Sequence, residues 1–225
     1  MSALRALNSV LLPKMRAPRE VETAVPTGAI LSTKLRSSLG LWVLLPLIGG
    51  ALIFSTHMVM NTFSAIVWKN QGISAGTIGA LIAVGAAAEA AVMFSWARLQ
   101  NWFGARQLVL IASFAACIRW LIMAASPPVW LLFPLQLMQG VTFTFSYLGC
   151  LYFIANRTDE SVSAEAQSLF GVMQQGASVL AVLSFGLLFD YVGVHAFGGV
   201  ALLSAGVAGL IIWSLKIMPS GVGQD

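Results

Sequence analysis

Residues 85–94 read GAAAEAAVMF, an apolar run with a single carboxylate, Glu89. The run lies within a longer apolar stretch, residues 75–96, which matches the roughly 20 residues that a helix needs to cross a bilayer. An ionised side chain in hydrocarbon is costly, so an acid in such a helix is expected to pair with another group or to face a polar cavity. The surroundings of Glu89 therefore depend on whether the whole chain lies in a membrane.

The composition favours a membrane protein. Of the 225 residues, 58% are hydrophobic and only 9% are charged, with a mean hydropathy of +0.86, whereas soluble domains carry about 25% charged residues. Windows of about 20 apolar residues predict an all-α fold, a polytopic membrane helical bundle with six transmembrane helices. We place these helices at Leu41–Trp68, Ala75–Trp96, Gln107–Ala125, Val129–Ala155, Ala166–Asp190 and Ala196–Ile217.

Short polar segments separate the six stretches, so consecutive helices are expected to pack as antiparallel neighbours. We predict three regions: a polar, basic cytoplasmic lead or linker over residues 1–38, a six-helix transmembrane domain over 39–218 and a cytoplasmic tail over 219–225. The lead holds six of the twelve basic residues together with three prolines, and we expect it to be largely extended.

The positions of lysine and arginine predict the orientation. Basic residues gather in the lead, in the loops after the second and fourth helices and in the tail, whereas the other side carries only Lys69. The positive-inside rule then places both termini in the cytoplasm of a multi-pass membrane protein. A bacterial inner membrane is the expected location. Because topology explains the basic balance, the charge gives no sign of a nucleic-acid partner.

Glu89 and Arg119 are the two charges that lie deep in predicted spans. Counting residues from the inner helix ends, their depths differ by about 6 Å at 1.5 Å per residue, which a long arginine side chain can bridge. We predict that they pair, directly or through water. One interpretation is a structural clamp between two helices; the other is a proton or substrate site whose partners change during transport.

Other polar side chains recur within the spans. On the fourth predicted helix, Gln136, Gln139, Phe143, Ser146 and Cys150 follow a 3–4–3–4 spacing and share one face. Gly140 is expected to let this helix bend. Interhelical hydrogen bonding alone can account for each polar group, but together they predict a lined cavity. The candidate cavity residues are His57, Asn61, Gln136, Gln139, Ser146 and Gln174.

Small residues recur every four positions on the helix that carries Glu89. Gly79, Ala83, Ala87 and Ala91 form a stripe that is expected to pack closely against another helix. Glu89 points about 160° away from Ala91 around the helix, since each residue advances about 100°. We therefore expect the stripe and the acid to face different neighbours.

Catalytic motifs are missing from the sequence. There is no H-E-x-x-H motif, no nucleotide-binding glycine loop with a lysine and no Ser–His arrangement, and the two histidines cannot form a multi-histidine metal centre. Cys117 and Cys150 both fall inside predicted spans, so a disulfide framework is not expected. We predict no enzyme, no cofactor and no metal site.

Several segments together resemble a known family. Residues 66–94, IVWKNQGISAGTIGALIAVGAAAEAAVMF, residues 103–127, FGARQLVLIASFAACIRWLIMAASP, and residues 135–155, LQLMQGVTFTFSYLGCLYFIA, resemble the C-terminal half of a major facilitator superfamily transporter. The nearest resemblance is to the phenylpropionate permease group, which is proton-symporter-like. The matching positions are Gly85, Glu89, Gly104, Ala105, Arg106, Arg119, Trp120, Gln136, Gly140, Thr142 and Phe143. At Gln139 the chain departs from the group, which often has histidine there.

The resemblance implies a secondary transporter that moves a proton and a small organic solute, such as an aromatic acid, by alternating access. It assigns proton coupling or gating to Glu89 and Arg119, and a cytoplasmic-loop motif to Arg98, Gly104 and Arg106. Because the superfamily has twelve helices, the expected partner is an N-terminal six-helix half or a second copy of this chain. A split gene product, a truncated frame or a fragment would explain the length. The alternative is a non-transporting membrane assembly or scaffold protein, or an inactive transporter fragment.

Overall fold

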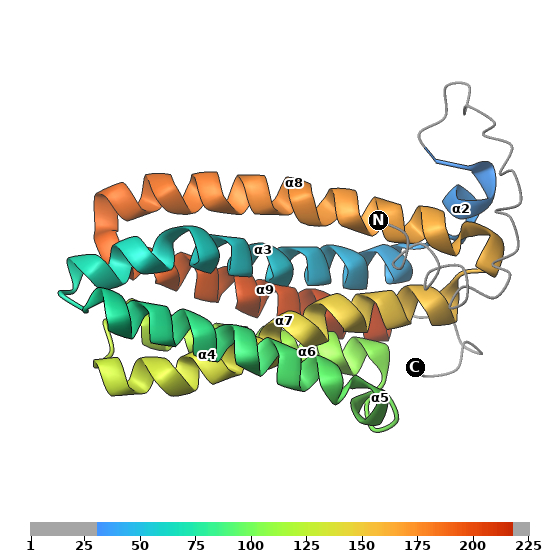
Figure 1. Ribbon diagram of the computed structural model, residues 1–225. Coiled ribbons are helices and arrows are strands. Elements are labelled where there is room, and N and C mark those ends of the chain that lie inside the picture. Colours follow the sequence, from blue (N-terminus) through green and yellow to red (C-terminus); the bar gives the residue numbers. More distant parts are fainter. Residues whose placement is uncertain (1–30, 218–225) are drawn as a thin grey trace, which may run out of the picture. The chain divides into compact units, whose positions relative to one another are not determined.

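The computed structural model describes residues 31–217 of the chain (Figure 1). Contacts divide the chain into two units, Met1–Ser32 and Thr33–Asp225, and the second unit holds all the helices given below. Residues 1–30 of the predicted lead and the whole of the predicted tail lie outside the described residues.

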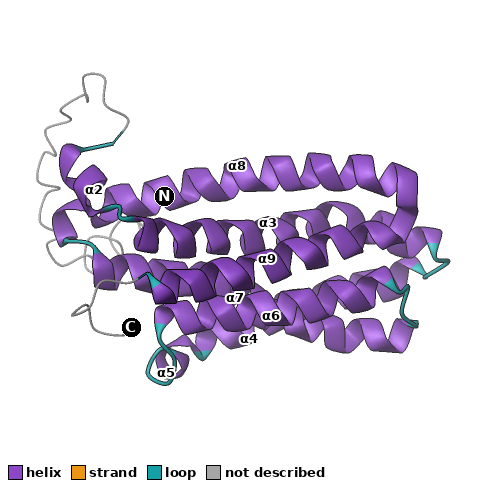
Figure 2. Cartoon of the chain, turned by 180° about the vertical axis from the view of Figure 1, so that it is seen from behind, coloured by secondary structure: helices purple, strands orange, loops and turns teal. Residues whose placement is uncertain are grey.

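The described residues form helices and no strand, which confirms the predicted all-α class. The elements in chain order are α2 (Thr33–Ser38), α3 (Leu41–Asn70), α4 (Ala75–Phe94), α5 (Trp96–Leu99), α6 (Ala105–Ala124), α7 (Val129–Arg157), α8 (Glu160–Val192), the 3-10 turn η1 (Gly193–Ala196) and α9 (Phe197–Lys216). Figure 2 shows the long helices side by side and joined by short connections.

By length and composition, five segments are apolar enough to cross a membrane, and the fifth runs over Glu160–Lys216. A single helix of that length would be about 85 Å long, nearly three times the hydrocarbon core. The segment is divided at η1, where Gly193 has a φ of +58°, and α9 runs back beside the bundle (Figure 1). The six predicted crossings therefore correspond to α3, α4, α6, α7, α8 and α9.

The turn between α7 and α8 is shorter than the sequence predicts. The sequence predicts a loop over residues 156–165, which include two glutamates and three serines or threonines with short apolar residues between them, but α7 continues to Arg157 and α8 begins at Glu160. Asp159 occupies the N-cap position and Glu160 the first turn of α8, where the helix dipole favours acidic residues. A second difference is α2, a six-residue helix within the segment that was expected to be extended.

Each long helix runs antiparallel to the one before it, so the described chain starts and ends at the same end of the bundle (Figures 1 and 2). We call this the basic end. It contains α2, α5 and the α7–α8 turn, and its basic residues are Lys34, Arg36, Arg98, Arg106, Arg157 and Lys216, whereas the other end has Lys69. The asymmetry that the sequence predicts is thus present in the fold.

The helices pack unequally. α3 packs against α7, α8 and α9, and α6 packs against α7 and α9, whereas α4 packs mainly against α7. Among consecutive long helices of the described residues, only α6 and α7 pack extensively, so the prediction that consecutive helices are packing neighbours was wrong for the other pairs. The buried residues of α4 are Leu81, Gly85 and Ala88. The predicted packing stripe was therefore wrong for this chain: Gly79, Ala83, Ala87 and Ala91 are all exposed. α4 meets α7 on the face that carries Gly85 and Ala88, because Gly140 of α7 lies against the backbone of Ala88.

A proline inside α3 is compensated by a side chain of α9. Pro46 has no N–H group, so the carbonyl of Trp42, one turn earlier, loses its helical partner. The hydroxyl of Ser214 donates a hydrogen bond to that carbonyl oxygen at 2.9 Å. In a bilayer such backbone groups need partners from neighbouring helices, so Ser214 ties α9 to the proline site of α3.

Ser214→Ala is expected to lower the stability of the bundle by about 1–2 kcal/mol, since it leaves the partly buried Trp42 carbonyl unsatisfied. The measurement is denaturant unfolding of the purified protein in detergent micelles. In a Pro46→Ala background, where the carbonyl regains a backbone partner, the same change should cost clearly less. An equal loss in both backgrounds would contradict this explanation.

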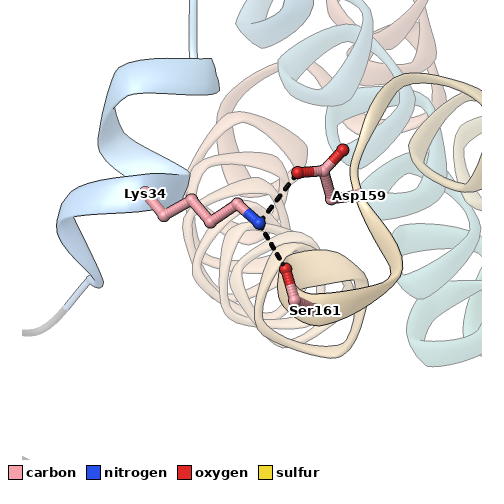
Figure 3. Close-up of polar contacts among 3 residues, drawn as sticks. All are labelled: Lys34, Asp159 and Ser161. Carbon is pink, nitrogen blue, oxygen red and sulfur yellow. Dashed lines mark hydrogen bonds and ion pairs between the residues drawn. The ribbon is translucent and has the colours of Figure 1, made fainter.

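A surface ion pair joins α2 to the start of α8. Lys34 Nζ lies 2.8 Å from Asp159 Oδ2 and donates a hydrogen bond to Ser161 Oγ at 2.7 Å (Figure 3). Leu35, the next residue of α2, is fully buried. The hydrogen bond from Lys34, together with its charge, lowers the pKa of the Asp159 carboxyl below its ordinary value.

The attachment of α2 is expected to weaken in acid. Because the pKa of Asp159 is lower in the folded state, its contribution is fully present above the ordinary value of 3.8 and disappears as the pH falls through the folded pKa. Amide hydrogen exchange over residues 33–38 should therefore accelerate as the pH drops below that value, after correction for intrinsic rates. In Lys34→Ala the acceleration should already be present at neutral pH; unchanged exchange in this variant would show that the pair does not hold α2.

Candidate functional site

The site begins where α4 and α7 cross. A Cβ atom placed on Gly140 would lie 2.5 Å from the carbonyl oxygen of Ala88 and 3.1 Å from the amide nitrogen of Glu89, and one on Gly85 would lie 3.1 Å from Gln136 Nε2. The two backbones are therefore in contact, which only residues without a side chain allow. This crossing places Glu89 of α4 beside Gln139, the residue before Gly140.

A single amide connects the two buried charges. Gln139 Nε2 donates to Glu89 Oε1 at 2.6 Å, and Arg119 Nη2 donates to Gln139 Oε1 at 2.7 Å. Within residues 31–217, no direct ion pair joins Glu89 to Arg119. The predicted direct pairing is therefore not found: the side chain of Gln139 lies between Glu89 and Arg119 and is hydrogen-bonded to both.

Arg119 is held from several sides. It is fully buried, and its Nη2 also donates to Gln136 Oε1 at 2.8 Å, while Gln136 Nε2 donates to the carbonyl of Leu81 at 3.2 Å. The guanidinium lies 4.6 Å from the ring centroid of Trp120, a favourable cation–π distance. Its Nε and Nη1 have no hydrogen-bond partner among the described residues. The cation thus retains unused donors in an otherwise closed site.

The network continues to α3. His57 Nε2 lies 3.0 Å from Thr142 Oγ1, and Thr142 Oγ1 donates to the backbone carbonyl of Gln139 at 3.2 Å. His57 Nδ1 lies 3.3 Å from the carbonyl oxygen of Ile53. His57, one of the predicted cavity residues, is therefore connected through the hydroxyl of Thr142 to Gln139, the residue that joins the two charges.

The remaining cavity candidates lie elsewhere. Gln174 of α8 is buried and lines a pocket of about 330 Å³ with Tyr147. Ser146 is buried and donates to the carbonyl of Phe143 in its own helix at 2.9 Å. Asn61 is exposed and makes no contact with the network. The fold thus gathers Glu89, Arg119, Gln136, Gln139 and His57 in one cluster and leaves Asn61, Ser146 and Gln174 outside it.

The predicted loop motif lies at the basic end, away from this cluster. Gly104 is the N-cap of α6, and its N–H donates to Gln107 Oε1 at 3.1 Å. Arg106 is buried, with its guanidinium carbon 5.8 Å from the ring centroid of Phe153, whereas Arg98 is exposed on α5. Gly104 therefore caps the start of α6, Arg106 packs it against α7, and Arg98 takes part in neither contact.

Within residues 31–217, no group of three or more histidine, cysteine or acidic side chains that could hold a metal ion occurs. Cys117 and Cys150 are both free thiols.

Sequence reasoning missed two features of the site. Gly140 was expected to let a helix bend, but its function is to let α7 touch the backbone of α4. Thr142 was noted only as a neighbour of the polar face, yet it connects His57 to α7. The sequence does contain a signal for this crossing. Gly85 and Glu89 lie one turn apart on one helix, and Gln139 and Gly140 are adjacent on another, so a glycine stands beside a polar side chain on each helix.

A family model described as the MFS_1 like family matches residues 42–198, which run from the start of α3 into the start of α9. The chain belongs to the MFS_1-like family. The match covers every element of the network, from His57 to Gln139. It also covers the α4–α7 crossing.

Curated relatives of this MFS_1-like chain are transporters by name. It is 30% identical over 154 residues to "Probable 3-phenylpropionic acid transporter" of Escherichia coli (strain K12), a match covering 68% of this chain and 40% of the relative. It is 23% identical to "Uncharacterized transporter YwbF" of Bacillus subtilis (strain 168), covering 72% and 41%, and 26% identical to "Maltose permease" of Geobacillus stearothermophilus, covering 58% and 33%. No solved structure matches the chain significantly.

The matched regions thus span between one third and about two fifths of the length of these relatives. The family and the six apolar helices establish a multi-pass membrane protein of a transporter family. They leave its solute and its coupling ion to be inferred from the site.

Proposed function

We propose that this chain is the half-length part of a proton-coupled secondary transporter that moves a small organic solute, such as an aromatic acid, by alternating access. The observation that carries the proposal is the bridge Arg119–Gln139–Glu89. One end of the bridge, Arg119, is fully buried, while the other, Glu89, is only partly buried. A carboxylate in such a position can exchange a proton with water while staying connected to a buried cation.

Protonation of Glu89 would change the energy of the α4–α7 contact. The N–H of Gln139 binds a full negative charge when Glu89 is ionised, and hydrogen bonds to charged groups are roughly twice as strong as neutral ones. When Glu89 takes a proton, Arg119 keeps two amide oxygens but loses the anion beyond them. A proton shifts a conformational equilibrium only if the energy of protonation differs between the two conformations. The α4–α7 contact would provide that difference if it is closed in one conformation and open in the other.

The proposal includes the orientation and the partner. The basic end is assigned to the cytoplasm by the positive-inside rule, which places both termini there, in a bacterial inner membrane. Because the relatives are longer than this chain, an N-terminal six-helix half or a second copy is proposed to complete the transport unit. Residues 1–38 would serve as the linker to that half, and residues 219–225 as a tail.

The test is uptake of labelled 3-phenylpropionate into vesicles, with and without an imposed proton gradient. The chain is reconstituted alone and with a candidate N-terminal half. In the active combination, Glu89→Gln should abolish the response to the gradient but keep exchange of solute across the membrane. The control is Asp190→Asn, which alters an exposed acid and should leave both unchanged.

The same assay separates coupling from a structural clamp and from a protein that does not transport. If Glu89→Gln reduces gradient-driven uptake and exchange equally, Glu89 acts as a clamp. If no combination takes up any labelled solute, the scaffold or inactive-fragment alternative is favoured instead.

A further inference from the structure

A second site lies between α7 and α8, in the half of the bundle nearer the basic end. This pocket, of about 330 Å³, is lined by Tyr147, Leu151, Ala164, Gln167, Ser168, Phe170, Gly171 and Gln174. Its volume falls at the small end of the range for ligand pockets. It is separate from the Arg119 cluster, since none of those charged or bridging side chains lines it.

The lining of this pocket is polar but uncharged. It offers a phenol, two carboxamides and a hydroxyl, and none of the eight residues is acidic or basic. The carboxamide nitrogen of Gln174 is buried and has no hydrogen-bond partner among the described residues. A buried polar group of this kind calls for an explanation, and a hydrogen-bond acceptor on a ligand would provide one.

Aromatic rings extend from the pocket towards α3. The ring of Tyr147 is stacked on that of Phe143, with centroids 6.1 Å apart and an interplanar angle of 24°. Phe54 of α3 lies 6.2 Å from Tyr147 and 5.7 Å from Phe143. These distances are typical of favourable ring pairs. Of these three rings, Tyr147 lines the pocket together with Gln174, so its ring is the surface on which another ring can pack.

We propose that this pocket is the subsite for the uncharged, ring-bearing end of the transported solute. The ring packs on Tyr147, and an acceptor on the solute takes the free N–H of Gln174. The inference rests on the proposed function in one respect, namely that the chain binds an organic solute. A carboxylate in the pocket would be desolvated without a cation, so a charged end of the solute lies outside it.

The position of the pocket also suggests how occupancy reaches the charge network. Phe143, which stacks on Tyr147, contacts His57 edge-to-face at 5.4 Å, and His57 is hydrogen-bonded to Thr142. Tyr147, Phe143 and Gln139 follow one another at intervals of four residues on α7, and so share a face. A solute ring that displaces Tyr147 would therefore also displace Phe143, which lies between Tyr147 and Gln139 on the same face of α7.

The decisive experiment compares two glycines of α8. A Cβ atom meets nothing within 4 Å at either Gly171 or Gly176, but only Gly171 lines the pocket. Gly171→Leu should fill the pocket and weaken binding of 3-phenylpropionate and of neutral 3-phenylpropanamide by about tenfold or more. Gly176→Leu should bind both as the unmodified chain does. Binding is measured by calorimetry on the full chain in lipid nanodiscs.

A second pair of variants tests the hydrogen bond. Gln174→Leu should weaken binding of both compounds several-fold, whereas Gln175→Leu, which changes an exposed neighbour, should not. Hexanoate, which has no ring, should bind more weakly than either compound. The proposal is overturned if Gly171→Leu binds like Gly176→Leu, if the amide does not bind while the acid does, or if neither binds the unmodified chain. Because none of these results depends on uptake, they stand or fall separately from proton-coupled transport.

Discussion

Gly140→Ala is expected to destabilise the bundle by roughly 2–3 kcal/mol, the upper part of the range for forcing extra atoms into a packed contact. The new Cβ would lie 2.5 Å from the carbonyl oxygen of Ala88, and a backbone atom cannot turn aside as a flexible side chain can. α4 must therefore move away from α7. That movement lengthens the hydrogen bond between Gln139 and Glu89, so the loss includes a charged contact as well as packing.

The measurement for Gly140→Ala is denaturant unfolding in detergent micelles, followed by far-ultraviolet circular dichroism. Gly79→Ala, on the exposed face of α4 where a Cβ meets nothing within 4 Å, is the matched control. It should be neutral or stabilising by up to about 1 kcal/mol, because alanine favours a helix more than glycine does. A loss in Gly79→Ala as large as the loss in Gly140→Ala would contradict this explanation, because the helix preference of alanine can only oppose a loss.

Gln139→Leu is expected to have the largest effect, roughly 3–5 kcal/mol. The substitution removes an acceptor from the buried guanidinium of Arg119 and the donor that Glu89 uses. Arg119 then keeps only Gln136 as a side-chain acceptor, in a place where its Nε and Nη1 already lack partners. Removing one member of a buried charged network costs this much because it leaves a charge uncompensated.

Gln139→His separates loss of the bridge from loss of packing. A neutral imidazole has one donor and one acceptor nitrogen, so it can accept from Arg119 and donate to Glu89, and histidine is the residue expected here from the family resemblance. We expect it to recover more than half of the stability that Gln139→Leu loses, again measured by unfolding in micelles. If leucine and histidine destabilise the protein equally, the amide is not acting as a bridge.

The positions of the helices could be read from the sequence because length and hydropathy are properties of a segment alone. Helix ends were less predictable. Residues 160–165 are low in hydropathy, yet they form the first turns of α8, since Asp159 and Glu160 favour the start of a helix. Hydropathy does not record that preference, so the loop was drawn too long.

The candidate site was predictable in its members but not in its connections. Residue counting along each helix predicts similar depths in the bilayer for Glu89 and Arg119, and both side chains do reach Gln139. Which face of α4 turns towards the bundle is determined by the helix that packs against it. The pattern of residues within α4 does not reveal that Gly140 of α7 is its contact. For the same reason the stripe of Gly79 was placed on the wrong face, and Asn61 was expected to face a cavity although it is exposed.

The dependence of α4 on a distant helix has a consequence for biosynthesis. Gln139, the partner of Glu89, lies 50 residues further along the chain, so the ribosome needs roughly 3–10 s to reach it at about 5–20 residues per second. If α4 leaves the translocon within that interval, Glu89 lacks its Gln139 partner and little of the surface of α4 is covered. Formation of the protein would then depend on the order in which its helices are released into the bilayer, as well as on the contacts of the final fold.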